Sequence, residues 1–166
     1  MPAVRADLVD VYVFREVGGA HELLQLRRTG EPMAGTWQPV MGHIEAGETA
    51  VLAAVRELGE EVGLRPAGGA WLGFWQLEEV HPYFVAALDA VVLSPRFAVQ
   101  VDASWEPDLS GERTHDGHRW VRGDDVRGRF MWPGQVRACE EVAGLLATRG
   151  SVLERALRLE PPASAR

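Results

Sequence analysis

Two stretches near the start of the chain alternate apolar and polar residues. Residues 8–15 carry valines at every second position, and residues 21–28 form a second stretch of similar character. A period of two is typical of half-buried β-strands. Gly18 and Gly19 stand between the two stretches and favour a tight turn. The pattern therefore predicts a β-hairpin.

The apolar spacing then changes to that of a helix. One stripe of a helix over residues 49–62 would hold Val51, Val55, Leu58 and Val62. Thr49 is a suitable N-cap, and Gly63 stands where a left-handed residue would end the helix. A second helix is predicted over residues 134–148, where Pro133 precedes apolar residues at the same spacing.

Further strands are expected in the second half of the chain. The aromatic and β-branched stretches that suggest them are residues 71–77, 83–93 and 118–122. A short helix is expected to end at Leu159, before Pro161 and Pro162. Strands on both sides of a helix, with another helix near the C-terminal end, predict an α/β protein in which a mixed β-sheet lies between two helical layers.

Composition limits the class of protein. The chain has 166 residues, of which 46% are hydrophobic, which is enough for one domain with a proper core. We expect this domain over residues 1–160, followed by a disordered tail over residues 161–166. The sequence shows no apolar run of membrane-spanning length and no signal-peptide core, and its one cysteine, Cys139, fits best as core filler. These features predict a cytoplasmic protein.

Three acidic residues lie on a separate arc of the first predicted helix. Glu57, Glu60 and Glu61 stand at positions i, i+3 and i+4. Carboxylates this close repel one another, and a hard divalent cation relieves the repulsion because it prefers oxygen ligands. A glutamate-rich helical face is also typical of a solvated surface. Glycine in the preceding loop favours the metal site, because Gly42 lets the backbone approach a metal and phosphates closely.

The segment from Gly42 to Leu64 carries a longer signature. It reads GHIEAGETAVLAAVRELGEEVGL. The positions at which the signature requires one residue type are Gly42, Glu48, Arg56, Glu57, Glu60, Glu61 and Gly63. This pattern resembles the complete box of the Nudix hydrolases. The resemblance implies an α/β/α sandwich, cleavage of a nucleoside diphosphate linked to another group, and Mg²⁺ or Mn²⁺ as the cofactor.

The resemblance also implies roles for single residues. It makes Glu57, Glu60 and Glu61 the metal ligands. Metal ions there would bridge phosphate oxygens, offset their charge and lower the pKa of an attacking water. Glu48 and Arg56 are interpreted as a structural pair in which the arginine holds the loop through a bidentate contact. Because the net charge of −7 repels a polyphosphate at long range, the cation and a few arginines must supply the attraction.

The residues before the box indicate a substrate class. Trp37-Gln38 followed by Val40-Met41-Gly42 is similar to the dihydroneopterin triphosphate pyrophosphohydrolase branch of the family. We therefore expect a nucleoside-triphosphate-like substrate, either dihydroneopterin triphosphate or a dNTP, cleaved to monophosphate and pyrophosphate.

The expected substrate contacts come from several parts of the chain. Arg28 would meet phosphate, with Arg27 on the opposite face of the strand. Trp37 and Tyr83 would offer aromatic surfaces, and Trp75 and Trp132 are further aromatic candidates. All of these aromatic residues also fit a core role.

A further acid is expected in the loop before Trp120. Family members often carry Glu-His a few residues before such a tryptophan. Here a strict count places Thr114 and His115 at those positions. Glu112 is our first choice for this further acidic residue, which would act as metal ligand or base, and Asp116 is the second.

Two other functions stay open. Tyr83 also stands near the position of a tyrosine in diadenosine polyphosphate hydrolases, which is the alternative enzyme. A nucleotide-sensing module without catalysis is a different class, although its box is usually degraded. In every case the partner is a small nucleoside or pterin polyphosphate. We expect no membrane association and no stable nucleic-acid binding, and a homodimer and a monomer are both left open.

Overall fold

The main sheet of the protein is mixed and is built around strand β2. The computed structural model describes residues 1–31, 33–111 and 113–162. The strands of the main sheet are β2 (Leu8–Val17), β3 (Ala20–Arg28), β4 (Trp37–Gln38), β5 (Val40–His43), β6 (Trp71–Gln76), β9 (Arg96–Val101) and β10 (His115–Arg122). Their order is β10-β3-β2-β9-β6. Strands β2 and β9 run parallel, and the other pairs are antiparallel.

The short strands β4 and β5, which directly precede the loop before α1, extend the sheet. Strand β4 pairs with β3, and β5 pairs with β2. Gly42 of β5 lies in register with Val9 of β2, and Trp37 of β4 lies in register with Arg27 of β3. The residues that precede helix α1 are thus fixed by backbone pairing to the two central strands.

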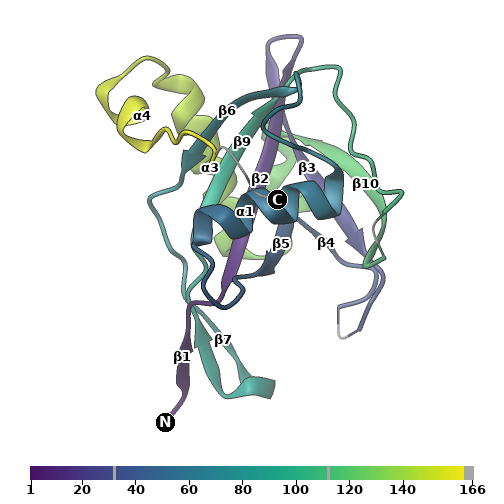
Figure 1. Cartoon of the computed structure of the whole chain (residues 1–166), viewed down its shortest axis with the longest axis vertical. Coiled ribbons are helices and arrows are strands. Elements are labelled where there is room, and N and C mark those ends of the chain that lie inside the picture. The colour runs from purple at the N-terminus through teal and green to yellow at the C-terminus, as the bar shows by residue number, and fades with distance from the viewer. Residues whose placement is uncertain (32, 112, 163–166) are drawn as a thin grey trace.

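Helices cover both faces of the sheet, as Figure 1 shows. Their bounds are α1 (Ala50–Val62), α2 (Val126–Arg129), α3 (Pro133–Ala147) and α4 (Val152–Leu157). Alternate residues of β2 enter two separate cores. Val9, Val11 and Val13 pack with α1, whereas Tyr12 and Phe14 pack with α3. The predicted α/β architecture with a mixed sheet between two helical layers is confirmed.

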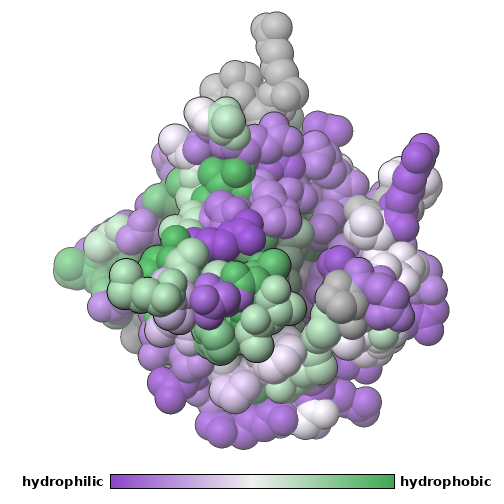
Figure 2. Space-filling view, turned by 90° about the horizontal axis from the view of Figure 1, so that it is seen from below, coloured by the Kyte–Doolittle hydropathy of each residue, from purple (hydrophilic) through white to green (hydrophobic). Residues whose placement is uncertain are grey.

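A second, small sheet lies at the lower end of the molecule in Figure 1. It contains β1 (Ala3–Arg5), β8 (Ala90–Val92) and β7 (Tyr83–Val85) in that order. Seen from below, apolar residues gather at this end (Figure 2). Val4, Phe84 and Leu88 are among the exposed apolar side chains.

The sequence-based elements need two corrections. The single strand predicted over residues 83–93 is wrong, because the chain turns through the 3-10 helix η1 (Ala86–Leu88) and Asp89, whose φ is 45°. Strand β9 was missed, although it lies between β2 and β6, and so were the short elements β1, β4, β5 and α2. The predicted hairpin is confirmed, with Gly18 and Gly19 both at positive φ in its turn. No helix in the described part of the chain is long and apolar enough to cross a membrane.

Candidate active site

Helix α1 presents its carboxylates beside β5. The Thr49 side chain accepts a hydrogen bond from the Leu52 N–H at 3.3 Å, and Gly63 adopts φ 70° at the other end. The apolar stripe of the helix is buried against the sheet. This packing fixes the rotation of the helix, so that Glu57 and Glu61 are largely buried while the Glu60 side chain is 59% exposed.

The closest approach between helix and strand is at Gly42. A Cβ atom at this position would lie 1.9 Å from the carboxyl carbon of Glu57. The Glu57 carboxylate therefore occupies the space that any other residue would need for its side chain. Burial raises the pKa of Glu57, and the neighbouring Arg56 offsets part of this effect. An ionised carboxylate in this position gains from a nearby positive charge.

Glu61 faces the strand ahead of the box and the start of β10. The Met41 N–H lies 3.4 Å from Glu61 Oε2, and His115 Nδ1 lies 4.0 Å from Glu61 Oε1. His115 is buried, and its Nε2 is 3.0 Å from Gln38 Nε2. A chain of polar contacts thus links Gln38, His115 and Glu61. Sequence analysis gave His115 no role, although it occupies the histidine position of the Glu-His pattern.

Arg56 connects the helix to the preceding loop. Its Nε and Nη2 lie 3.0 Å from the two oxygens of Glu48, and Nη2 also donates to the His43 carbonyl at 2.7 Å. Its Nη1 donates to Glu57 at 2.7 Å and to Glu60 at 3.1 Å. The hydrogen bonds from Arg56 lower the pKa of Glu48. One guanidinium therefore contacts both sides of the helix–loop junction.

The donor set fits a hard divalent cation by its chemistry. Glu57, Glu60 and Glu61 offer carboxylate oxygens, the ligands that Mg²⁺ and Mn²⁺ prefer. A cation beside the buried Glu57 carboxylate would offset an unfavourable charge. In the part of the chain that the structure describes, no three acidic, histidine or cysteine side chains are grouped to hold a metal. Instead, Arg56 binds two of the three carboxylates.

Arg28 ends β3 opposite His115 of β10. Its Nε donates to the Gly30 carbonyl at 3.1 Å, and its backbone N–H donates to Thr36. The arginine is therefore held near the residues that contact Glu61. Glu112, the first choice for the further acid, lies outside the described residues. Asp116, the second choice, is engaged by Arg27 through contacts of 2.7 and 3.0 Å.

Trp37 lies on the opposite face of the sheet from α1. Its ring is covered by the Arg119 guanidinium, 4.2 Å from the ring centroid, and Arg27 approaches to 5.9 Å. The structure therefore brings two arginines to the tryptophan that was predicted to stack on substrate. Arg119 had no role in the sequence analysis, because its proximity to Trp37 depends on the pairing of three strands.

The other aromatic candidates lie apart from Trp37. Tyr83 belongs to the small sheet and is 36% exposed. Burial raises the pKa of its phenol, with Asp10 as the next contribution. Trp75 is a core residue whose Nε1 donates to Glu154 at 2.7 Å, so the suggestion that it stacks on substrate is wrong. Trp132, just before α3, is 51% exposed.

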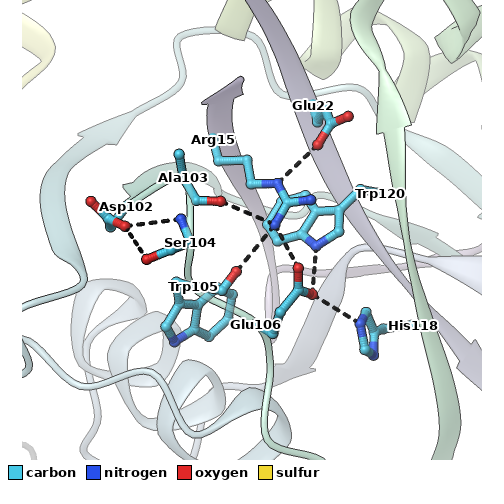
Figure 3. Close-up of polar contacts among 9 residues, drawn as sticks. All are labelled: Arg15, Glu22, Asp102, Ala103, Ser104, Trp105, Glu106, His118 and Trp120. Carbon is cyan, nitrogen blue, oxygen red and sulfur yellow. Dashed lines mark hydrogen bonds and ion pairs between the residues drawn. The ribbon is translucent and has the colours of Figure 1, made fainter. Parts of the chain in front are cut away.

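The loop before β10 is anchored by Arg15 (Figure 3). Its guanidinium lies 4.0 Å from the centroid of the Trp120 ring and donates to the Trp105 carbonyl at 3.2 Å and to Glu106 at 2.7 Å. Glu106 also accepts hydrogen bonds from Trp120 Nε1 at 2.9 Å and lies 3.1 Å from His118 Nε2. These contacts fix the chain that leads toward His115 and so support the position of β10.

Family membership follows from the sequence comparison. The family model of the NUDIX domain matches residues 4–142. The chain therefore belongs to the Nudix family. This membership supports an enzyme that hydrolyses phosphoric anhydride bonds, and Nudix enzymes generally use divalent metal cations.

Solved structures share this fold at low sequence identity. The Ap4A hydrolase of C. elegans superposes with a TM-score of 0.70 at 19% identity, covering 86% of this chain and 98% of that one. The dihydroneopterin triphosphate pyrophosphohydrolase of E. coli gives 0.68 at 18% identity, covering 85% and 97%. The NUDIX domain of NrtR from Shewanella oneidensis, complexed with ADP ribose, gives 0.66 at 16% identity, covering 88% and 89%. These likenesses show the fold.

A sequence relative is known from Myxococcus xanthus. It is an octanoyltransferase, 34% identical over 115 residues, which are 68% of this chain and 30% of that protein. The chain therefore spans less than a third of the length of this relative. The acyl transfer in its name describes that larger protein.

Proposed function

We propose that this protein is a divalent-metal-dependent pyrophosphohydrolase that cleaves a nucleoside-triphosphate-like substrate to a monophosphate and pyrophosphate. The contact between Gly42 and Glu57 carries the proposal. It joins a buried carboxylate of α1 to the backbone of the strand that follows the Trp37-Gln38 sequence. Catalytic carboxylates and a substrate-class motif are thus joined through one short strand.

Glu57, Glu60 and Glu61 would hold Mg²⁺ or Mn²⁺, which when bound offsets phosphate charge and makes water a better nucleophile. Because Gly42 has no side chain, the Glu57 carboxylate can lie against the strand that follows the Trp37-Gln38 sequence. Arg56 and Glu48 keep the loop in place. In the reaction, water adds to phosphorus, one P–O–P bond breaks, and the displaced pyrophosphate takes the bonding electron pair.

Substrate orientation would come from the residues around β4. Arg28 meets phosphate, because a guanidinium makes charge-assisted hydrogen bonds to phosphate oxygens. Trp37, beside Arg119, receives the flat heterocycle. Glu112 stays our proposal for the further acid, supported by its position before Trp120 in the sequence.

The alternative enzyme is a diadenosine polyphosphate hydrolase. The exposed face of Tyr83 is the observation that favours it, since a second adenine needs a second aromatic surface. The two functions differ in their products. A triphosphate monomer gives pyrophosphate, whereas asymmetric cleavage of diadenosine tetraphosphate gives ATP and AMP.

Chromatography of reaction mixtures tests the proposal. The purified protein is incubated with dihydroneopterin triphosphate, each dNTP, diadenosine tetraphosphate and ADP-ribose, with Mg²⁺ or Mn²⁺. We expect monophosphate and pyrophosphate from a triphosphate monomer, and loss of turnover in Glu57→Gln. A specificity constant for diadenosine tetraphosphate far above that of every triphosphate would establish the alternative. Binding without turnover of any compound would indicate the sensing module.

A further inference from the structure

Arg119 belongs to a row of side chains on the sheet face opposite α1. It lies on β10 in register with Gln25 of β3, and Arg27 of β3 lies in register with Trp37 of β4. Its Nε and Nη2 donate to Gln25 Oε1 at 2.9 and 2.7 Å, and Nη2 also donates to the Arg129 carbonyl at 3.3 Å. The guanidinium is thus held over Trp37, 4.2 Å from the ring centroid, by neutral acceptors.

The hydrogen bonds of Arg119 to the residues that the structure describes are all to neutral oxygens. Three other partly or fully buried arginines, Arg15, Arg56 and Arg96, form ion pairs with carboxylates, whereas the partly buried Arg28 donates to the Gly30 carbonyl. Within the described ranges of the chain, no carboxylate forms an ion pair with Arg119. Burial lowers its pKa, and the nearby Arg129 lowers it further. A half-buried cation without a counter-charge is unfavourable, unless a ligand supplies acceptor atoms.

The Nη1 group of Arg119 is available to donate a hydrogen bond to such a ligand. Nε and Nη2 are already bonded, whereas Nη1 donates to none of the residues described by the structure. Nη1 is a donor in every protonation state relevant to proteins, because an arginine side chain has no acceptor. The site therefore favours a flat group with an acceptor atom on its edge and disfavours a donor at the same place.

The position of this donor relative to the catalytic carboxylates follows from β4. Trp37 and Gln38 are consecutive, and successive side chains of a strand point to opposite faces. Gln38 contacts His115, which lies beside Glu61. Because β4 is only two residues long, the Trp37 face and the residues that contact Glu61 are one residue apart along the chain.

We propose that Arg119 is a specificity-determining residue that selects heterocycles carrying a ring oxo group, such as a 6-oxopurine or a 4-oxopteridine, over adenine. A ring oxygen accepts a hydrogen bond from Nη1, whereas the amino group of adenine is a donor and opposes the guanidinium. Stacking on Trp37 is available to both kinds of ring and so gives no selection. This inference rests on the proposed function, because it assigns the heterocycle of that substrate.

Calorimetric titration with dIMP and dAMP tests this role without requiring turnover. At position 6, dIMP carries an oxo group and dAMP an amino group, and the two share the same phosphate and sugar. We expect the wild-type protein to bind dIMP about tenfold more tightly, and Arg119→Gln to lose this preference through weaker dIMP binding. Arg27→Gln is the matched control, because it removes a charge from the same face that is already paired with Asp116; its preference should persist.

Each other outcome overturns the inference. Equal binding of dIMP and dAMP by the wild-type protein excludes selection by Arg119, and equal weakening of both in Arg119→Gln assigns the arginine to phosphate. If thermal unfolding shows that Arg119→Gln is not folded, Arg119→Lys replaces it in the titration. This variant keeps the positive charge but lacks the planar donor group, so it should lose most of the preference for dIMP. Full preference in Arg119→Lys excludes the proposal. A protein that selects dIMP through Arg119 but hydrolyses no triphosphate would refute only the proposed function.

Discussion

Arg56 and Glu48 join helix α1 to the loop before it through two hydrogen bonds of 3.0 Å each. The same guanidinium donates to the His43 carbonyl at 2.7 Å, so it holds the loop by side chain and backbone together. A bidentate pair of this kind fixes geometry as well as charge. The pair lies at the junction that places Gly42 against Glu57, and its loss should therefore affect folding and catalysis together.

We expect Arg56→Ala to lower the free energy of unfolding by about 2–4 kcal/mol, because it leaves a partly buried carboxylate and a carbonyl without their donor. Activity should fall with it. Thermal and urea unfolding beside a turnover assay measure both effects. Arg127→Ala is the control, since its ion pair with Glu140 is exposed and should contribute less than about 1 kcal/mol. Lost activity with unchanged stability and metal binding would instead give Arg56 a direct catalytic role.

Glu61→Gln tests the metal site. The substitution removes a negative charge beside Met41 and His115 while keeping the size of the side chain. We expect calorimetric titration with Mn²⁺ to show affinity weakened at least about tenfold, since loss of even an outer partner of a metal site costs about 10- to 100-fold. Glu45→Gln, an exposed acid in the preceding loop, should bind Mn²⁺ as the wild-type protein does. Unchanged affinity and turnover in Glu61→Gln would remove this residue from the metal site.

Local signals predicted the elements that local chemistry determines. Thr49, Gly63 and the apolar stripe between them defined α1, and Gly18-Gly19 defined the turn of the hairpin. Strand β9 was not predicted, because it is buried at nearly every position and begins with Arg96. Its sequence therefore shows neither an alternation of apolar and polar residues nor an apolar first residue. The turn at Asp89 has no glycine or proline, and residues 83–93 therefore resembled one continuous strand.

The candidate site was predictable within α1 and the segment that directly precedes it. Helical spacing placed Glu57, Glu60 and Glu61 on one arc, which is a property of the helix alone. The contact of Glu61 with His115 requires β10 to pair with β3, and the position of Arg119 over Trp37 requires β4 as well. Such contacts depend on strand order and register, and no local pattern in the sequence encodes them.

Asp10 should make stability depend on pH. It is buried, it accepts a hydrogen bond from Ser94 at 2.9 Å, and burial raises its pKa to about 6. The folded protein therefore binds the proton more tightly than the unfolded chain does. Its contribution to stability is complete below the ordinary carboxyl range and is lost as pH rises through about 6.

The comparison with Asp10→Asn measures this effect. The free energy of unfolding of the wild-type protein minus that of Asp10→Asn should fall by about 3 kcal/mol between about pH 3.5 and pH 7, from a shift of roughly two pKa units. Asp102→Asn is a control of opposite sign, because hydrogen bonds from Ser104 lower the pKa of the exposed Asp102; that difference should rise with pH. A flat difference for Asp10→Asn would show that burial does not shift this carboxyl.

Gly42 and Gly59 both lie in the box, but only at Gly42 does the structure leave no space for a side chain. A Cβ at Gly42 would lie 1.9 Å from the Glu57 carboxyl group, which is the movable end of a side chain, so Gly42→Ala should displace this carboxylate at little cost in stability. Turnover should fall by about 100-fold, the usual effect of misplacing a catalytic group by about 1 Å. A Cβ at Gly59 would meet Arg65 at 3.5 Å and the Leu64 carbonyl oxygen at 4.0 Å, both ordinary contacts. Gly59→Ala should therefore raise the free energy of unfolding by about 0.5–1 kcal/mol without loss of turnover.

Urea unfolding, Mn²⁺ titration and turnover of both glycine variants check this contrast. Weaker Mn²⁺ binding in Gly42→Ala alone would tie its loss of turnover to the position of the Glu57 carboxylate. Retained turnover in Gly42→Ala would mean that this carboxylate can leave the strand without affecting the reaction, and Glu57 would then lose its assigned role. A stability loss in Gly59→Ala would reveal a contact at this position that the backbone geometry of α1 does not require.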